Sequence, residues 1–144
     1  MKFSTVFLVV AATFASVHAA PAVSTLQARG VDPALVPDFG IQAGASPDGH
    51  GNCVGFGGKL IPCSCPPPRD QFINDLNANV AAGHAVNNPG IPISFPTGPS
   101  KADQQARIAA LLVTLQNING PGIGCPAVST VYAQLQQQIN ALPN

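Results

Sequence analysis

Four cysteines in a chain that begins like an exported protein place the strongest constraint on the fold. Residues 1–19 have the layout of a secretory signal peptide: Lys2 gives a positive start, an apolar run follows, and Val17-His18-Ala19 fits a cleavage site after Ala19. An exported chain matures in an oxidising compartment, where an even number of cysteines pairs into disulfide bonds. We therefore expect a secreted, extracellular protein with two disulfides among Cys53, Cys63, Cys65 and Cys125.

The cysteine spacing limits how these bonds can form. A bond between Cys63 and Cys65 would close a very tight ring, so Cys53 should bond to one member of this pair and Cys125 to the other. We favour Cys53–Cys63 with Cys65–Cys125, and Cys53–Cys65 with Cys63–Cys125 stays open. Either arrangement closes a loop of about 60 residues, which contributes roughly 4 kcal/mol in the chain-entropy account. The competing interpretation is a zinc site of His50, Cys53, Cys63 and Cys65, but this spacing matches no familiar zinc pattern. We expect no metal and no other cofactor.

Charged side chains are unusually scarce. The chain has six Lys and Arg, six Asp and no Glu, so 8% of its residues are charged, against roughly 25% in an average soluble domain. Without a basic patch, nucleic acid and anionic membranes are poor partners. No second long apolar run offers a membrane anchor. A surface of carboxamides and hydroxyls instead fits a polysaccharide or another protein, and the oligomeric state is left open.

Three segments have the spacing of amphipathic helices: residues 70–82, 101–118 and 127–142. Their apolar residues recur every three or four positions, as on one face of a helix; they include Phe72, Leu76, Ile108, Leu111, Leu115, Val128, Tyr132, Leu135 and Ile139. The opposite face of the first helix should expose Asn74, Asp75, Asn77 and Asn79 to solvent. Gly83 is expected to end that helix, and Ser100 with Asp103 resembles a capping box before the second. These patterns predict an all-α fold, a compact three-helix domain.

The remaining segments are expected to connect these helices. Residues 20–50 show no period and should be irregular, and cleavage after Arg29 would make residues 20–29 a propeptide. Residues 53–65 fit a short extended segment whose apolar side chains are partly buried; these are Val54, Phe56, Leu60 and Ile61. Ile91, Ile93 and Phe95 alternate in a proline-rich connection, but its prolines leave few backbone donors for a sheet. We thus expect one disulfide-stabilised helical domain over residues 51–144, with proline-rich connections.

A catalytic set is hard to assemble from this chain. His84, Asp75 and a serine could in principle form a Ser-His-Asp arrangement, but no nucleophile motif in the sequence supports it. His84 directly follows Gly83, where a histidine commonly interacts with the last helical carbonyls. Asp70 and Asp75 lie five positions apart on the expected helix, so their carboxylates point in different directions, unlike a glycosidase pair. With the cysteines bonded, no thiol nucleophile remains. We expect no catalytic residues and no enzyme.

Six segments in the second part of the chain are informative in combination. They are Ile61-Pro-Cys-Ser-Cys-Pro-Pro-Pro-Arg-Asp-Gln-Phe-Ile73, Leu76-Asn-Ala-Asn-Val-Ala-Ala-Gly83, Val86-Asn-Asn-Pro89, Ser94-Phe-Pro96, Thr114-Leu-Gln-Asn117 and Asn119-Gly-Pro-Gly-Ile-Gly-Cys-Pro126. From about residue 50 to its end, the chain resembles a family of small secreted fungal proteins with four cysteines, most of them uncharacterised. The resemblance implies a protein of the fungal secretome or cell wall, on spores or at a host interface, and it carries no catalytic residues.

Together these observations predict a non-enzymatic secreted protein of the fungal cell wall or conidial surface. It would coat or mask wall polysaccharide and so affect host immune recognition and virulence. Two alternatives stay open. The first is a secreted effector that binds a host protein, and the second is a small hydrolase whose site the sequence does not reveal.

Overall fold

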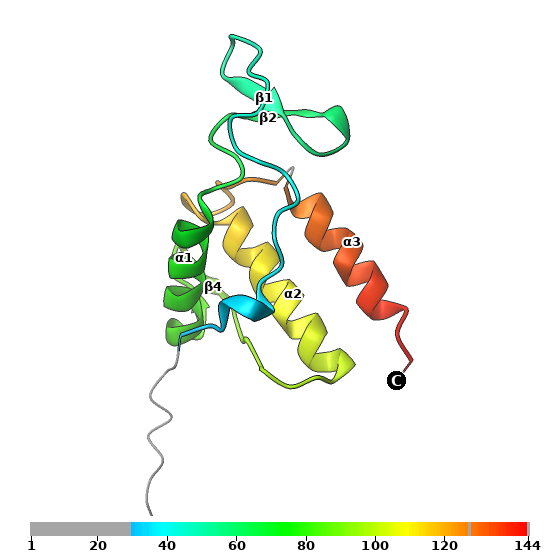
Figure 1. The fold of residues 1–144 in the computed structure, drawn as a ribbon. Coiled ribbons are helices and arrows are strands. Elements are labelled where there is room, and N and C mark those ends of the chain that lie inside the picture. The colour runs from blue at the N-terminus through cyan, green and yellow to red at the C-terminus, as the bar shows by residue number, and fades with distance from the viewer. Residues whose placement is uncertain (1–29, 127, 144) are drawn as a thin grey trace, which may run out of the picture.

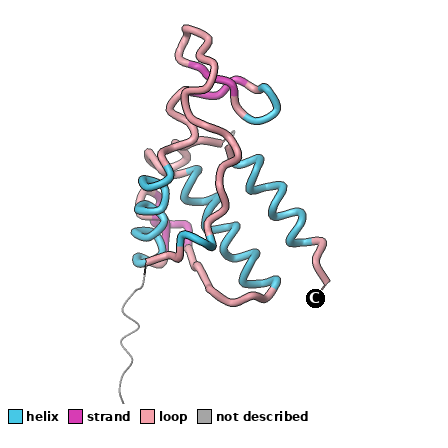
Figure 2. The backbone as a smooth tube through the Cα atoms, in the orientation of Figure 1, coloured by secondary structure: helices cyan, strands magenta, loops and turns pink. Residues whose placement is uncertain are grey.

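A computed structural model of the chain describes residues 30–126 and 128–143. The expected signal peptide, residues 1–19, and propeptide, residues 20–29, lie outside the described residues. The described part forms three α-helices, two antiparallel pairs of strands and two turns of 3₁₀ helix (Figures 1 and 2). In chain order they are η1 (Pro33–Leu35), β1 (Asn52–Val54), η2 (Phe56–Gly58), β2 (Leu60–Pro62), α1 (Arg69–Ala82), β3 (His84–Ala85), β4 (Asn88–Pro92), α2 (Lys101–Gln116) and α3 (Ser129–Asn140).

The expectation of an all-α fold is wrong, because two small antiparallel sheets accompany the helices. In the first, β1 pairs with β2 and Cys53 lies opposite Ile61; in the second, β3 pairs with β4 and His84 lies opposite Pro92. Prolines in β2 and β4 argue against a wide sheet. A two-stranded sheet accepts them because each strand keeps one outer edge, where a residue without an N–H loses no ladder bond. The fold is therefore mixed α/β.

The three helices lie where the apolar spacing predicts them. α1 covers Arg69–Ala82, one residue longer at its start than expected, and α2 covers Lys101–Gln116. α3 covers Ser129–Asn140 and is shorter at both ends than the predicted segment. The helix period thus located each element to within about two residues, as expected for local patterns.

Two helix ends also follow the sequence signals. Gly83 closes α1 with a left-handed φ of 73°, and its N–H donates to the Val80 carbonyl. This conformation favours glycine because it has no Cβ. At the start of α2, the Ser100 hydroxyl accepts a hydrogen bond from the Asp103 N–H at 3.1 Å. The expected capping interaction is therefore confirmed.

α2 lies between α1 and α3 and contacts both (Figure 1). Three buried aromatic rings pack against one another in the core, those of Phe39, Phe72 and Tyr132. The ring centroids of Phe39 and Phe72 are 5.2 Å apart in an edge-to-face contact, and those of Phe72 and Tyr132 are 6.3 Å apart. Aromatic pairs at such spacings add to the burial of their surface.

The N-terminal segment, residues 30–41, is part of this core. It contains only the short turn η1, yet Val31, Val36 and Phe39 are buried. In Figure 1 it runs in blue and cyan from beside α1 across α2. The lack of a period in this part of the sequence therefore reflects a covering segment that packs on the helices.

The two disulfides join different parts of the fold. Cys53–Cys63 links the two arms of the β1–β2 hairpin, and Cys65–Cys125 ties the chain before α1 to the chain before α3. These are the bonds favoured from the sequence, and no cysteine of the described residues is free. Over the same residues, none of the helices combines the length and the apolar character that a membrane crossing requires.

Candidate functional site

The β1–β2 hairpin is the most prominent feature outside the helical body. It projects from one end of the molecule (Figure 1). Val54 and Phe56 are each 39% exposed, and Leu60 is 60% exposed, while Ile61 is buried. The expectation that all four are partly buried is thus wrong for the outer three, because a narrow hairpin has no second layer to cover them. Exposed apolar groups gathered on one element are typical of a binding surface.

The hairpin is held in one shape by its covalent and backbone constraints. Cys53–Cys63 closes it. At Gly55, a Cβ atom would lie 2.8 Å from Ile61 Cγ2, so only glycine allows this approach. The Gly55 N–H then donates to the Lys59 carbonyl at 2.6 Å. The exposed side chains are therefore presented on a preordered support.

Asp48 orders the loop that leads into β1. Its carboxylate accepts hydrogen bonds from the backbone N–H groups of His50 at 2.7 Å and Asn52 at 3.0 Å. The bond from His50, followed by one from the Asn52 side chain, lowers the pKa of Asp48. This local turn motif is a common structural use of aspartate, and it places His50 in a loop rather than in a metal site.

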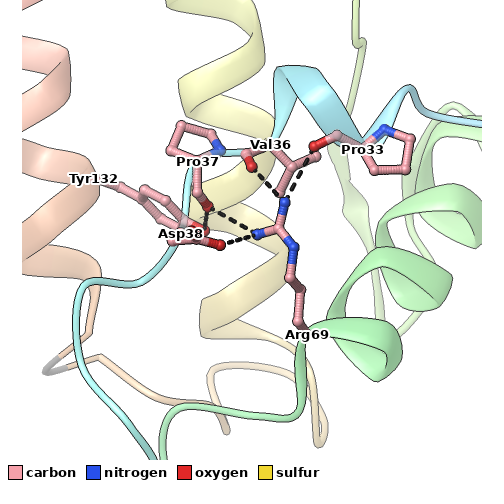
Figure 3. Close-up of polar contacts among 6 residues, drawn as sticks. All are labelled: Pro33, Val36, Pro37, Asp38, Arg69 and Tyr132. Carbon is pink, nitrogen blue, oxygen red and sulfur yellow. Dashed lines mark hydrogen bonds and ion pairs between the residues drawn. The ribbon is translucent and has the colours of Figure 1, made fainter.

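Arg69 ties the N-terminal segment to the start of α1 (Figure 3). Its Nη2 donates to the carbonyls of Pro33 at 3.1 Å and Val36 at 2.8 Å, and its Nη1 lies 2.7 Å from the Asp38 carboxylate. The Asp38 side chain is 84% exposed, so this ion pair contributes little. The carbonyl bonds matter more, because Arg69 supplies a donor to the half-buried Val36 carbonyl and adds a second donor to the Pro33 carbonyl, which also accepts from the Val36 N–H within η1.

Tyr132 supports the same segment from α3. Its ring is fully buried, and its hydroxyl donates to the Pro37 carbonyl at 3.2 Å (Figure 3). Burial raises the pKa of the Tyr132 phenol, and the nearby Arg69 charge opposes this shift only in part. The hydroxyl therefore stays neutral and acts as a donor that fixes packing.

Asn79, expected on the solvent face of α1, instead joins α1 to α2 and to the turn between β3 and β4. Asn79 is buried; its Nδ2 donates to Thr114 Oγ1 at 2.9 Å, and its Oδ1 accepts from the Val86 N–H at 2.8 Å. Asn117, at the end of α2, accepts from Asn88 Nδ2 at 3.1 Å. The prediction of a solvent-exposed face is wrong at Asn79, because Phe72, Leu76 and Asn79 follow one another at i, i+4 and i+7.

The residues considered for catalysis lie in different local environments of the structure. His84 begins β3, and Asp70 is exposed in the first turn of α1. Asp75 lines a cavity of about 60 Å³, where burial raises the pKa of Asp75 despite a hydrogen bond from Gln71. Among the described residues that line this cavity, Asp75 is the one ionisable group. No acid–base pair is formed there.

In this structure the cysteines of the zinc site considered from the sequence are not available as metal ligands. Cys53, Cys63 and Cys65 are all bonded in disulfides, and a bonded sulfur has no thiolate to offer a metal. Nor do the residues with described positions bring three potential ligand side chains together elsewhere.

A groove of about 360 Å³ lies between α2, α3 and the N-terminal segment. Most of its lining side chains are aliphatic: Leu35, Ile108, Leu111, Leu135, Ile139 and Leu142. Gln104, Arg107 and Gln138 supply polar groups. The projecting hairpin and this groove are both candidate binding features.

Comparison with models of known protein families, with curated proteins and with solved structures finds no match to this chain.

Sequence reasoning missed Arg69 and the asparagine contacts. Arg69 bonds to residues more than 30 positions away, and no local pattern reveals such partners. Asn79 was accessible to sequence reasoning, because its place on the Phe72–Leu76 stripe signals burial.

Proposed function

We propose that this chain is a secreted, non-enzymatic fungal protein that coats the cell wall or conidial surface, with the β1–β2 hairpin as its attachment element. The observation that supports this most is the presentation of Val54, Phe56 and Leu60 in solvent on a disulfide-closed hairpin. A preordered hairpin loses little conformational entropy on binding. The resemblance found in the sequence supplies the fungal setting.

The rest of the surface fits a coat. The outer side of α3 exposes carboxamides, including Gln134, Gln137 and Gln138, and only 8% of the chain is charged. Carboxamides donate and accept hydrogen bonds, as sugar hydroxyls do, without a fixed charge. A layer with this surface would screen underlying polysaccharide from host receptors and lower immune recognition of conidia.

The second candidate is a secreted effector that binds a host protein. It is favoured by the aliphatic character of Val54 and Leu60, because exposed apolar groups of this kind mark protein–protein contacts. Both candidates use the hairpin, so the location and partner of the protein decide between them.

Fractionation of washed walls and culture medium tests the coat. The variant F56S/L60S removes the apolar groups of the hairpin. Ile123→Ser is the matched control, because Ile123 is 61% exposed on a different surface turn. We expect the wild-type protein and the control in the wall fraction, and F56S/L60S in the medium.

Deletion of the gene tests whether the coat screens wall polysaccharide from host recognition. Conidia without the protein should show changed surface staining and stronger immune recognition, and the wild-type gene should restore both. The coat is contradicted if the protein is absent from washed walls and deletion changes neither readout. Hairpin-dependent binding of the free protein to a host protein would then support the effector.

A further inference from the structure

The groove between α2 and α3 has the size and lining of a small-molecule site. Its volume of about 360 Å³ falls within the range of pockets that hold small ligands. Ile108 and Leu111 are buried at its base, and Leu135 and Ile139 are half-buried on α3. An alkyl chain placed there would leave water for an apolar surface.

Arg107 gives the groove a positive charge that has no ion-pair partner among residues 30–126 and 128–143. Its Nη1 donates to the carbonyls of Pro96 at 2.8 Å and Gly98 at 2.7 Å, and both acceptors are neutral. Asp103, one turn earlier, bonds to the Ser100 hydroxyl at 2.6 Å. Within the described residues, Arg107 forms no ion pair. A ligand anion would therefore be complementary to this half-buried cation.

α2 and α3 are joined beside the groove. Gln105 Nε2 donates to Asn140 Oδ1 at 2.6 Å, which links the start of α2 to the end of α3. Farther along α2, the Cys125 N–H donates to the Leu115 carbonyl at 3.2 Å, next to the Cys65–Cys125 bond. These contacts fix the two helices relative to each other before any ligand enters, which lowers the cost of binding.

From these contacts we propose that the groove binds a free fatty acid with a single alkyl chain. The chain lies along Leu111, Leu135 and Ile139, and the carboxylate meets the Arg107 guanidinium. The carboxamides of Gln104 and Gln138 lie on the same lining; Gln104 Nε2 donates to the Pro99 carbonyl at 3.0 Å and keeps a second N–H, and Gln138 adds a further carboxamide donor. This inference is independent of the hairpin and of the proposed coat.

Calorimetric titration of the secreted, disulfide-bonded protein tests the proposal. The probes are dodecanoate and dodecanol below their aggregation concentrations, because they share a chain and differ in charge. Arg107→Gln removes the charge and Arg107→Lys keeps it. Ile139→Trp fills the groove, and Ile123→Trp makes the same change on a distant exposed position.

We expect dodecanoate to bind one to one and more tightly than dodecanol. Arg107→Gln should weaken dodecanoate binding about tenfold or more and leave dodecanol unchanged, since a charge-assisted bond is lost. Arg107→Lys should retain most of the difference between the two probes. Ile139→Trp should abolish binding of both, and Ile123→Trp should not.

Three results would overturn the proposal. The first is absence of dodecanoate binding by the wild-type protein. The second is equal weakening of both probes by Arg107→Gln, which would show that the charge does not recognise the ligand. The third is a concentration-dependent dimer that Ile139→Trp dissociates, which would make a second copy of the chain the occupant.

Discussion

A single side chain, Arg69, holds most of the polar contact between the N-terminal segment and the helices. It reaches the carbonyls of Pro33 and Val36, which lie more than 30 residues earlier in the chain. If Arg69 were absent, the half-buried Val36 carbonyl would need another donor, whereas the Pro33 carbonyl would keep its bond from the Val36 N–H. The position of the segment therefore depends on this residue more than on its own conformational preference.

Replacement of Arg69 should loosen this segment. We expect Arg69→Gln to lower the free energy of unfolding by about 1–3 kcal/mol, because the hydrogen bonds from its charged guanidinium to the carbonyls of Pro33, Val36 and Pro37 are lost. Asp38→Asn removes only the exposed ion pair and should cost less than about 1 kcal/mol. Urea denaturation measures both, and hydrogen exchange at residues 31–39 should rise only in Arg69→Gln. Equal losses in the two variants would assign the contact to the ion pair instead.

Asn79 is a second residue whose hydrogen bonds join separate elements of the fold. Asn79→Ala leaves the Thr114 hydroxyl and the Val86 N–H without their partner, and we expect a loss of about 1–3 kcal/mol. Thr114→Val in the Asn79→Ala background should recover part of that loss, because one unsatisfied polar group is removed. A double-mutant cycle in urea checks this, and strictly additive effects would contradict the coupling.

At the scale of the element, the start of α2 depends on Ser100. Ser100→Ala removes the acceptor of the Asp103 N–H, and we expect a loss of about 1 kcal/mol. Ser94→Ala, in the exposed connection before α2, is the control and should change stability little. Thermal unfolding followed by circular dichroism measures both variants. An unchanged midpoint in Ser100→Ala would show that water or another donor replaces the cap.

The two disulfides act on different elements. Loss of Cys65–Cys125 in C65S/C125S should destabilise the whole domain by about 4 kcal/mol, because this bond closes a loop of 60 residues. Loss of Cys53–Cys63 in C53S/C63S should act mainly on the hairpin, which it closes over 10 residues. Circular dichroism should then keep its helical signal while protease cuts within residues 44–62. Global unfolding of C53S/C63S would show that the hairpin is part of the cooperative core.

At the scale of the whole molecule, scarcity of charge should make stability nearly independent of pH. Asp48 and Asp75 have pKa values shifted in opposite directions. The lowered pKa of Asp48 gives stability above the unfolded value, near 3.9, which is lost as pH falls through the folded value. The raised pKa of Asp75 has the reverse effect, since the folded state then binds the proton more tightly.

Two variants separate these contributions. Relative to the wild-type protein, Asp48→Asn should be less stable at pH 7 than at pH 3, and Asp75→Asn should be more stable at pH 7 than at pH 3. Urea denaturation at both pH values gives the two differences. The assignment fails if both variants change the pH slope in the same direction.

The sequence by itself determined the three helices to within about two residues, the end of α1, the start of α2 and the participation of the four cysteines in disulfides. Helix spacing, the glycine at position 83 and the cap at Ser100 express interactions within four residues. Such interactions hold wherever the segment lies in the fold. The strain of a Cys63–Cys65 ring and the even number of thiols in an exported chain narrowed the disulfides to two arrangements, and the structure shows Cys53–Cys63 with Cys65–Cys125.

Only the tertiary structure decided the two hairpins, the packing of residues 30–41 and the groove at Arg107. A two-residue strand such as β3 has too few positions to show a period. It is ordered by its pairing with β4. The exposure of Leu60 and the burial of Asn79 depend on whether another layer of the protein covers them. These features arise from contacts between distant segments, and the separation along the chain hides them from any local pattern.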